Sequence, residues 1–116
     1  MVVRIGELAA STGVSPRSLR YYEQQGLITS ARTPAGHRRY DPAMVDAVIR
    51  VQELFAAGLC SSKIASLLPC LQAPQRARTP ALLADLLEQR ARLDAAEREI
   101  RRARQVLDEV IDALDD

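Results

Sequence analysis

The sequence predicts a mainly α-helical chain with one short β-hairpin, and three of its segments support that prediction. Residues 15–26 carry the start and stop signals of a short helix, and residues 27–40 carry the turn residues of a hairpin. Residues 80–115 repeat apolar side chains every seven positions, which is typical of a coiled-coil helix. A length of 116 residues suits one globular domain, or one small domain with an extended element.

The short helix begins at Ser15 and Pro16. Serine is a preferred N-cap, and proline is tolerated at the first helical position, where its missing N–H costs nothing. Gly26 ends the helix, because glycine readily adopts the left-handed conformation that other residues avoid. Leu19 and Tyr22 are expected to turn toward a core. The opposite side carries basic, hydroxyl and aromatic side chains: Arg17, Ser18, Arg20 and Tyr21.

A helix before this segment and a hairpin after it complete the predicted head. Ile5, Leu8 and Ala9 have helical apolar spacing, and the turn at 12–13 separates them from Ser15. After Gly26, residues 27–28 are expected to form one arm of a hairpin, residues 34–36 its turn and residues 37–40 a basic second arm. A helix followed by a basic hairpin is the arrangement of a winged helix-turn-helix, which reads a DNA groove and grips flanking phosphates.

Two further helices are expected before the coiled coil. Asp41 and Pro42 predict a helix start, and the apolar spacing continues to Gly58. Cys60 or Ser61 is expected to cap a second, short helix. Pro69 is expected to help end that helix, since proline is poorly tolerated in a helix interior. The predicted organisation is a winged helix-turn-helix domain with linker helices at 1–70, a loop at 71–79 and a dimerisation helix at 80–116.

The long helix carries one apolar stripe. Its first heptad position holds Leu86, Leu93, Ile100, Leu107 and Leu114. Such a stripe needs a partner, and a head of about 70 residues is too small to cover a helix on the order of 50 Å long. We therefore expect a homodimer rather than a helix folded back on its own head.

Several of these segments resemble the MerR family of bacterial transcription regulators. The resemblance rests on two separated blocks, Leu19–Glu23 with Gly26 and Leu27, and Gly36–Tyr40. The segments 5–9, 13–15 and 54–59 also fit. The resemblance implies a winged helix-turn-helix head and an antiparallel coiled coil between two chains. It also implies a dimer that binds pseudo-palindromic promoter DNA and distorts the spacer between the two polymerase contact elements.

Charge is unevenly distributed in a way that suits this expectation. Residues 1–40 carry a net charge of +4 and the remainder −3, so the basic excess lies on the predicted DNA-binding part. Arginine can bind a guanine edge or a phosphate in a bidentate manner. The expected DNA contacts are Ser15, Arg17, Ser18, Arg20, Tyr21, Arg32, Arg38, Arg39 and Tyr40.

Some assignments remain open at this point. Adjacent strand residues face opposite sides, so one of Arg38 and Arg39 is expected to face DNA, and the resemblance favours Arg38. Arg20 could instead pair with Glu23. His37 is interpreted as a surface turn residue. The resemblance implies weaker phosphate contacts at Lys63 and Arg50.

The sequence contains no recognisable enzyme motif. It has no glycine-rich phosphate loop, no H-E-x-x-H and no C-x-x-C, and one histidine provides no catalytic triad or metal cluster. No cofactor is expected. The sequence lacks a long apolar run and an export signal, so a cytoplasmic protein without membrane contact is expected.

Cys60 and Cys70 are the remaining candidates for chemistry. Without an export signal, two cysteines are expected to be reduced thiols. The favoured interpretation is structural, with Cys60 at a helix start and Cys70 half-buried. A role in thiol or soft-metal sensing is the alternative.

The predicted function is a homodimeric transcription regulator. Its expected partners are double-stranded promoter DNA, a second copy of the chain, RNA polymerase indirectly through the DNA, and an unidentified small-molecule effector. The alternatives are a coiled-coil adaptor that binds protein and an architectural DNA-binding protein that needs no effector.

Overall fold

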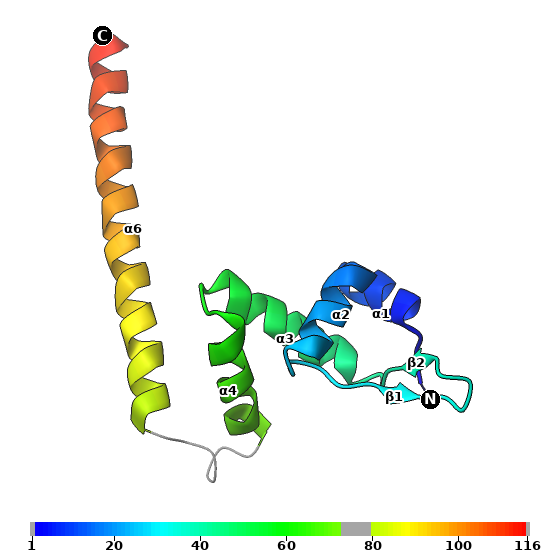
Figure 1. Ribbon diagram of the computed structural model, residues 1–116. Coiled ribbons are helices and arrows are strands. Elements are labelled where there is room, and N and C mark those ends of the chain that lie inside the picture. Colours follow the sequence, from blue (N-terminus) through cyan, green and yellow to red (C-terminus); the bar gives the residue numbers. More distant parts are fainter. Residues whose placement is uncertain (1, 73–79, 116) are drawn as a thin grey trace. The chain divides into compact units, whose positions relative to one another are not determined.

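The computed structural model describes residues 2–72 and 80–115 (Figure 1). The chain divides into two compact units, residues 1–78 and residues 79–116. We call the first unit the head and describe the two units separately. The head contains helices α1 (Ile5–Thr12), α2 (Pro16–Gln24), α3 (Met44–Ala56) and α4 (Ser61–Gln72), with strands β1 (Ala31–Arg32) and β2 (Arg38–Arg39). The second unit is the single helix α6 (Pro80–Leu114). The prediction of a mainly helical fold with a small hairpin and a long C-terminal helix is confirmed.

The start and stop signals of α2 act as the sequence predicts. Ser15 is the N-cap, and its hydroxyl oxygen accepts a hydrogen bond of 3.1 Å from the backbone N–H of Ser18. Pro16 is the first helical residue. Beyond the last turn, Gly26 has φ of 75°, the left-handed conformation that lets the chain leave the helix.

The hairpin between α2 and α3 is shorter and lies later in the sequence than predicted. Strands β1 and β2 are antiparallel and pair Ala31 with Arg39 and Arg32 with Arg38. Leu27 and Ile28, expected in the first arm, are instead buried in the core, because the apolar pair stabilises the head more when removed from water. We call residues 31–40 the wing.

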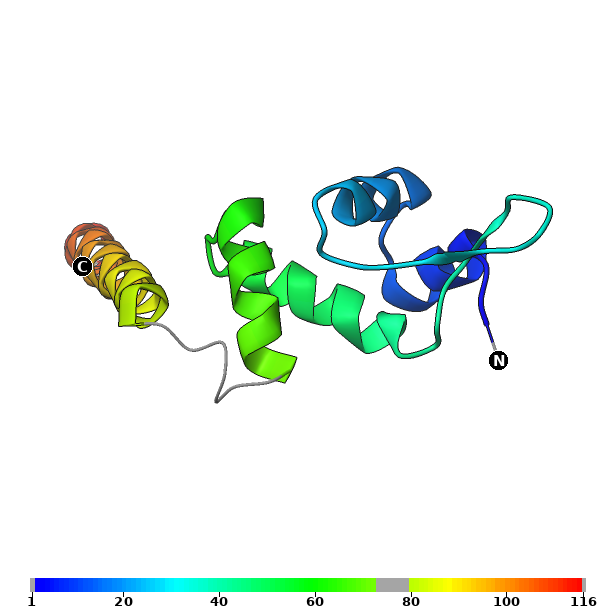
Figure 2. The same ribbon diagram turned by 60° about the horizontal axis from the view of Figure 1, so that its bottom comes forward.

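The wing is attached to the start of the chain. Tyr40 forms an isolated antiparallel bridge with Val3, and two backbone hydrogen bonds of 2.8 Å join them. In both ribbon views the hairpin accordingly lies beside the beginning of α1 (Figures 1 and 2). The base of the wing is therefore fixed by backbone hydrogen bonds to residues before α1.

Two apolar clusters hold the head together. The first joins α1, α2, α3 and the wing through buried Leu8, Val14, Leu19, Ile28, Tyr40 and Val48. The second joins α3 and α4 through Leu27, Val51 and Ile64. Tyr22 packs against both clusters, and its ring stacks on that of Phe55 with centroids 5.7 Å apart. Both rings thus pack against the core, as predicted, although each stays partly exposed.

Helices α3 and α4 differ from the prediction at one end each. The Asp41 side chain accepts a 2.8 Å hydrogen bond from the backbone N–H of Ala43, but regular helix begins only at Met44. Pro69 lies inside α4, which continues to Gln72, so the prediction that it helps end the helix is wrong. A proline removes only the hydrogen bond of its own nitrogen, and a helix can bend there and continue.

Helix α6 is one uninterrupted rod of 35 residues (Figure 1). It begins at Pro80, and none of its residues is buried in the single chain. Ion pairs between side chains four positions apart link Glu88 with Arg92 at 2.6 Å and Glu97 with Arg101 at 3.0 Å. No helix in the described ranges 2–72 and 80–115 carries an apolar stretch long enough to cross a membrane.

Candidate nucleic-acid interface

One face of α2 presents polar and aromatic side chains to solvent. Arg17 and Arg20 are exposed, and 46% of the Tyr21 side chain surface is accessible. Leu19 on the opposite face is completely buried, so the orientation of α2 is fixed by the core. The Ser15 hydroxyl, 3.1 Å from that of half-buried Ser18, caps the helix. The arrangement leaves two guanidinium groups and one phenol free to approach a ligand.

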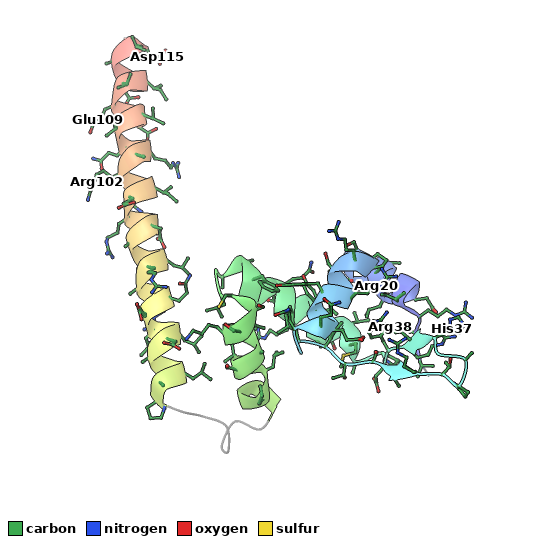
Figure 3. The ribbon with its side chains drawn as sticks, in the orientation of Figure 1. Arg20, His37, Arg38, Arg102, Glu109 and Asp115 are labelled. Atoms are coloured by element: carbon green, nitrogen blue, oxygen red, sulfur yellow. The ribbon has the colours of Figure 1, made fainter. Side chains whose placement is uncertain are left out.

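The wing adds three arginines on the same unit. Arg32 is exposed, and its guanidinium donates a 3.0 Å hydrogen bond to the carbonyl of Gly36 across the turn. Arg38 and Arg39 are both half-buried. Arg39 donates a 2.9 Å hydrogen bond to the carbonyl of Arg38. Figure 3 shows Arg20 of α2 together with His37 and Arg38 of the wing at one end of the head.

Glu23 connects α2 to the wing. Its carboxylate accepts hydrogen bonds of 3.2 Å from Nε of Arg38 and 3.2 Å from the hydroxyl of Tyr40. A further hydrogen bond comes from Ser30. The sequence left open a pairing of Glu23 with Arg20 three residues earlier, but the ion pair is with Arg38. The Glu23 contacts therefore fix the wing relative to α2.

Tyr40 lies elsewhere than predicted. It was expected to contact a phosphate at the surface, but its side chain is completely buried. Its hydroxyl donates a hydrogen bond to the Glu23 carboxylate. The cause is the bridge to Val3, which places residue 40 over the core rather than at the wing surface. Burial, together with the negative charge of Glu23, raises the pKa of the Tyr40 hydroxyl. Tyr40 therefore anchors the wing from inside.

The Glu23 carboxylate has a lowered pKa. Burial alone would raise the pKa, but the hydrogen bonds from Ser30, Arg38 and Tyr40 outweigh it and favour the charged form. Because the pKa of Glu23 is lower in the folded than in the unfolded protein, its ionised carboxylate stabilises the fold. This stabilisation is fully present above the ordinary glutamate pKa of about 4.3. It is lost as the pH falls through the lowered pKa of the folded protein.

We expect Glu23→Gln to be less stable than the wild type near pH 7 and to approach it in stability at acidic pH. The free energy of unfolding, measured with urea at a series of pH values, tests this. Glu53→Gln, which removes a more exposed carboxylate from the same unit, is the control and should leave the pH profile unchanged. A stability difference between Glu23→Gln and wild type that is the same at every pH would contradict the expectation.

The structure describes the side chain of Cys60 but not that of Cys70. Cys60 is exposed, its backbone carbonyl accepts the first hydrogen bond of α4 from Ile64, and its sulfur lies 3.2 Å from the hydroxyl of Ser62. The hydrogen bond from Ser62 and those from nearby backbone groups lower the pKa of its thiol. The side chain of Cys70 lies outside the described residues. Within the described residues, no group of three or more histidine, cysteine or acidic side chains could hold a metal ion.

Helix α6 presents a second candidate binding surface, along its apolar stripe. Exposed fractions reach 64% for Ile100, 60% for Leu107 and 82% for Leu114, whereas Leu86 is only half-exposed. Toward the C-terminus the stripe is wider than the heptad pattern predicts, because Val106 and Ile111 flank it and are more than half exposed. These two residues could have been found by marking the positions on either side of the heptad seam.

Comparisons with known proteins place the head among regulators. The sequence model of the family described as "MerR family regulatory protein" matches residues 4–40. The nodulation protein NolA of Bradyrhizobium sp. (strain NC92) is 44% identical over 62 residues, which are 53% of this chain and 26% of that protein. The mercuric resistance operon regulatory protein of Bacillus cereus is 39% identical over 69 residues, 59% of this chain and 52% of that protein. The chain thus spans about a quarter to a half of these relatives.

Solved structures resemble the fold over nearly the whole chain. A crystal structure assigned to the MerR family of transcriptional regulators, from Listeria monocytogenes, has a TM-score of 0.76 and 26% identity, and the match covers 97% of this chain and 86% of that one. HiNmlR, a MerR family regulator lacking the sensor domain and bound to promoter DNA, has a TM-score of 0.71 and 20% identity, over 96% of this chain and 88% of that one. The segment that contains α1, α2 and the wing thus matches the MerR family of regulatory proteins.

Proposed function

We propose that the chain is a homodimeric transcription regulator that binds double-stranded promoter DNA through α2 and the wing. The observation that carries the proposal is the exposed basic surface of these two elements, which lies within the segment matched by the family. HiNmlR, a protein of the same fold, was solved bound to promoter DNA. A protein adaptor would have no need for this concentration of arginines.

In this proposal the two elements have different tasks. Arg17, Arg20 and Tyr21 enter or border the major groove from α2, with the Ser15 and Ser18 hydroxyls at the start of the helix. Arginine there can bind a guanine edge or a phosphate, and tyrosine can donate to a phosphate. Arg32, Arg38 and Arg39 contact the flanking phosphates from the wing. Arg38 does so while its Nε remains anchored by Glu23, which limits the entropy lost on binding.

The exposed stripe of α6 supports the dimerisation part of the proposal. The heptad residues Leu86, Leu93, Ile100, Leu107 and Leu114 would pack against those of a second copy in an antiparallel coiled coil. Each chain would then present one α2 to one half-site of a pseudo-palindromic operator. The dimer would distort the spacer of the promoter and act on RNA polymerase through the shape of the DNA. An unidentified effector would modulate this activity.

The salt dependence of DNA binding tests the proposal. Binding through phosphates releases counterions, so the logarithm of the association constant falls with the logarithm of salt concentration by about 0.9 for each phosphate contacted. Fluorescence anisotropy with a labelled duplex at increasing KCl should therefore show a steep loss of affinity. Binding that is insensitive to salt, or absent at low salt, would argue against the proposal and favour an adaptor.

A further inference from the structure

Glu23 is an acidic residue at a position whose surroundings disfavour one. It lies in the last turn of α2, where the partial negative charge of the helix C-terminus repels a carboxylate. Arg20 of α2 and Arg38 of the wing lie at the same end of the head (Figure 3) and belong to the surface proposed to face DNA, whose phosphates repel a carboxylate as well. A residue that goes against local preferences in this way often marks a functional position.

The contacts of Glu23 reach from α2 to the segment that contains the wing. Its carboxylate accepts hydrogen bonds of 3.2 Å from Nε of Arg38 and 3.2 Å from the hydroxyl of Tyr40, and one more from Ser30. The side chains of Arg38 and Glu23 keep only 29% and 22% of their accessible surface, so water screens this ion pair less than a fully exposed one. Three residues between α2 and α3 are thus tied to the end of α2.

This anchor leaves part of the Arg38 guanidinium available. A guanidinium carries N–H donors on Nε and on both Nη nitrogens, and Glu23 engages the donor on Nε. Tyr40 completes the anchor from inside, because its side chain is completely buried and its backbone is joined to Val3 by two hydrogen bonds. The position of the Arg38 guanidinium relative to α2 is therefore set before any ligand binds.

We propose that Glu23 is a specificity-determining residue, which makes DNA binding depend on the shape of the duplex by fixing the wing relative to α2. With this spacing fixed, both elements make their contacts only on a duplex whose groove and backbone have the matching geometry. A wing that is free to move would instead adjust to the phosphates of any duplex. The Glu23 carboxylate also repels phosphates, which disfavours duplexes that do not satisfy both elements. The inference rests on the proposed function, because it takes the ligand to be duplex DNA.

The test compares Glu23→Gln with the wild type on two duplexes of equal length, by fluorescence anisotropy at neutral pH and constant KCl. One duplex is selected by the wild-type protein from a random library, and the other is a shuffled version of the same sequence. Affinity for the selected duplex should fall by about twofold to tenfold, because the wing must now be ordered on binding. Affinity for the shuffled duplex should rise, because a repulsive charge is gone. The ratio of the two affinities should therefore fall on the order of tenfold.

Two further variants separate positioning from charge and from stability. Glu88→Gln removes the same charge from an ion pair of α6 and should keep the wild-type ratio. Tyr40→Phe removes one hydrogen bond to Glu23 without changing the charge, and should lower the ratio by a smaller factor. A loss of stability alone would lower both affinities by the same factor and leave the ratio unchanged.

The outcomes separate this inference from the proposed function. A wild-type ratio in Glu23→Gln, or an equal change in affinity for both duplexes, would overturn the role of Glu23 and leave the proposed function intact. A wild-type protein that binds all duplexes equally well would also overturn the inference, because there would be no specificity for Glu23 to determine. A wild-type protein that binds no duplex at low salt would overturn the proposed function, and this inference with it.

Discussion

Replacing both Arg38 and Arg39 with alanine is expected to remove nearly all affinity of the protein for duplex DNA at physiological ionic strength. The two residues form the whole of β2, and the pairing with β1 places them beside Arg32 on the same small hairpin. Each phosphate contact that is lost should lower the salt slope by about 0.9, so affinity and slope should fall together. Anisotropy titrations with a labelled duplex at several KCl concentrations measure both quantities.

The matched control is alanine at Arg101 and Arg102. This pair removes the same charge from adjacent arginines of α6, at positions outside the heptad stripe. Because Arg38 also pairs with Glu23, Glu23→Gln shows how much of the effect comes from loosening the wing rather than losing the contact. DNA affinity unchanged in the double variant, or equally reduced in the α6 control, would contradict the assignment of the wing.

Replacing Ile100 and Leu107 with glutamate is expected to convert the protein to a monomer. Both side chains are largely exposed in the single chain, and the proposed dimer would bury two copies of each. Burial of one such side chain contributes about 1.5–3 kcal/mol, so the dimer should weaken by more than about a thousandfold. Sedimentation equilibrium over a range of protein concentrations measures the dissociation constant. DNA affinity should fall as well, because a monomer engages one half-site.

Gln105→Glu is the control for the dimer variant. It adds a negative charge to the same region of α6 at a position facing away from the stripe. It should leave the dissociation constant within a small factor of the wild-type value. A wild-type protein that sediments as a monomer, or a stripe variant that remains dimeric, would show that the stripe does not mediate dimerisation.

The local signals in the sequence predicted the helices well. The Ser15 cap, Pro16 and Gly26 define α2 by hydrogen bonds and backbone conformations within one short segment, so the pattern alone suffices. The exposed face of α2 follows from the same periodicity, because burial of Leu19 determines which residues face solvent. The apolar stripe of α6 could likewise be predicted from the sequence, because a heptad repeat is a local pattern that does not depend on the rest of the fold.

The errors occur where distant residues decide the structure. Tyr40 is buried because it pairs with Val3, 37 positions earlier, and no local pattern reveals that bridge. Glu23 forms its ion pair with Arg38 rather than with its helical neighbour Arg20, and Arg38 is likewise distant from Glu23 in the sequence. The hairpin strands are two residues long and take their position from pairing and core packing rather than from β propensity.

A footprint of the purified protein on the DNA upstream of its own reading frame tests whether the protein is a dimeric regulator that binds promoter DNA. A dimer that places one α2 on each half-site should protect a site with two-fold symmetry that lies between the two polymerase contact elements. The Arg38 and Arg39 double variant should leave that DNA unprotected. Absence of protection by the wild-type protein at low salt, on this DNA and on sequences selected from a random library, would contradict the account.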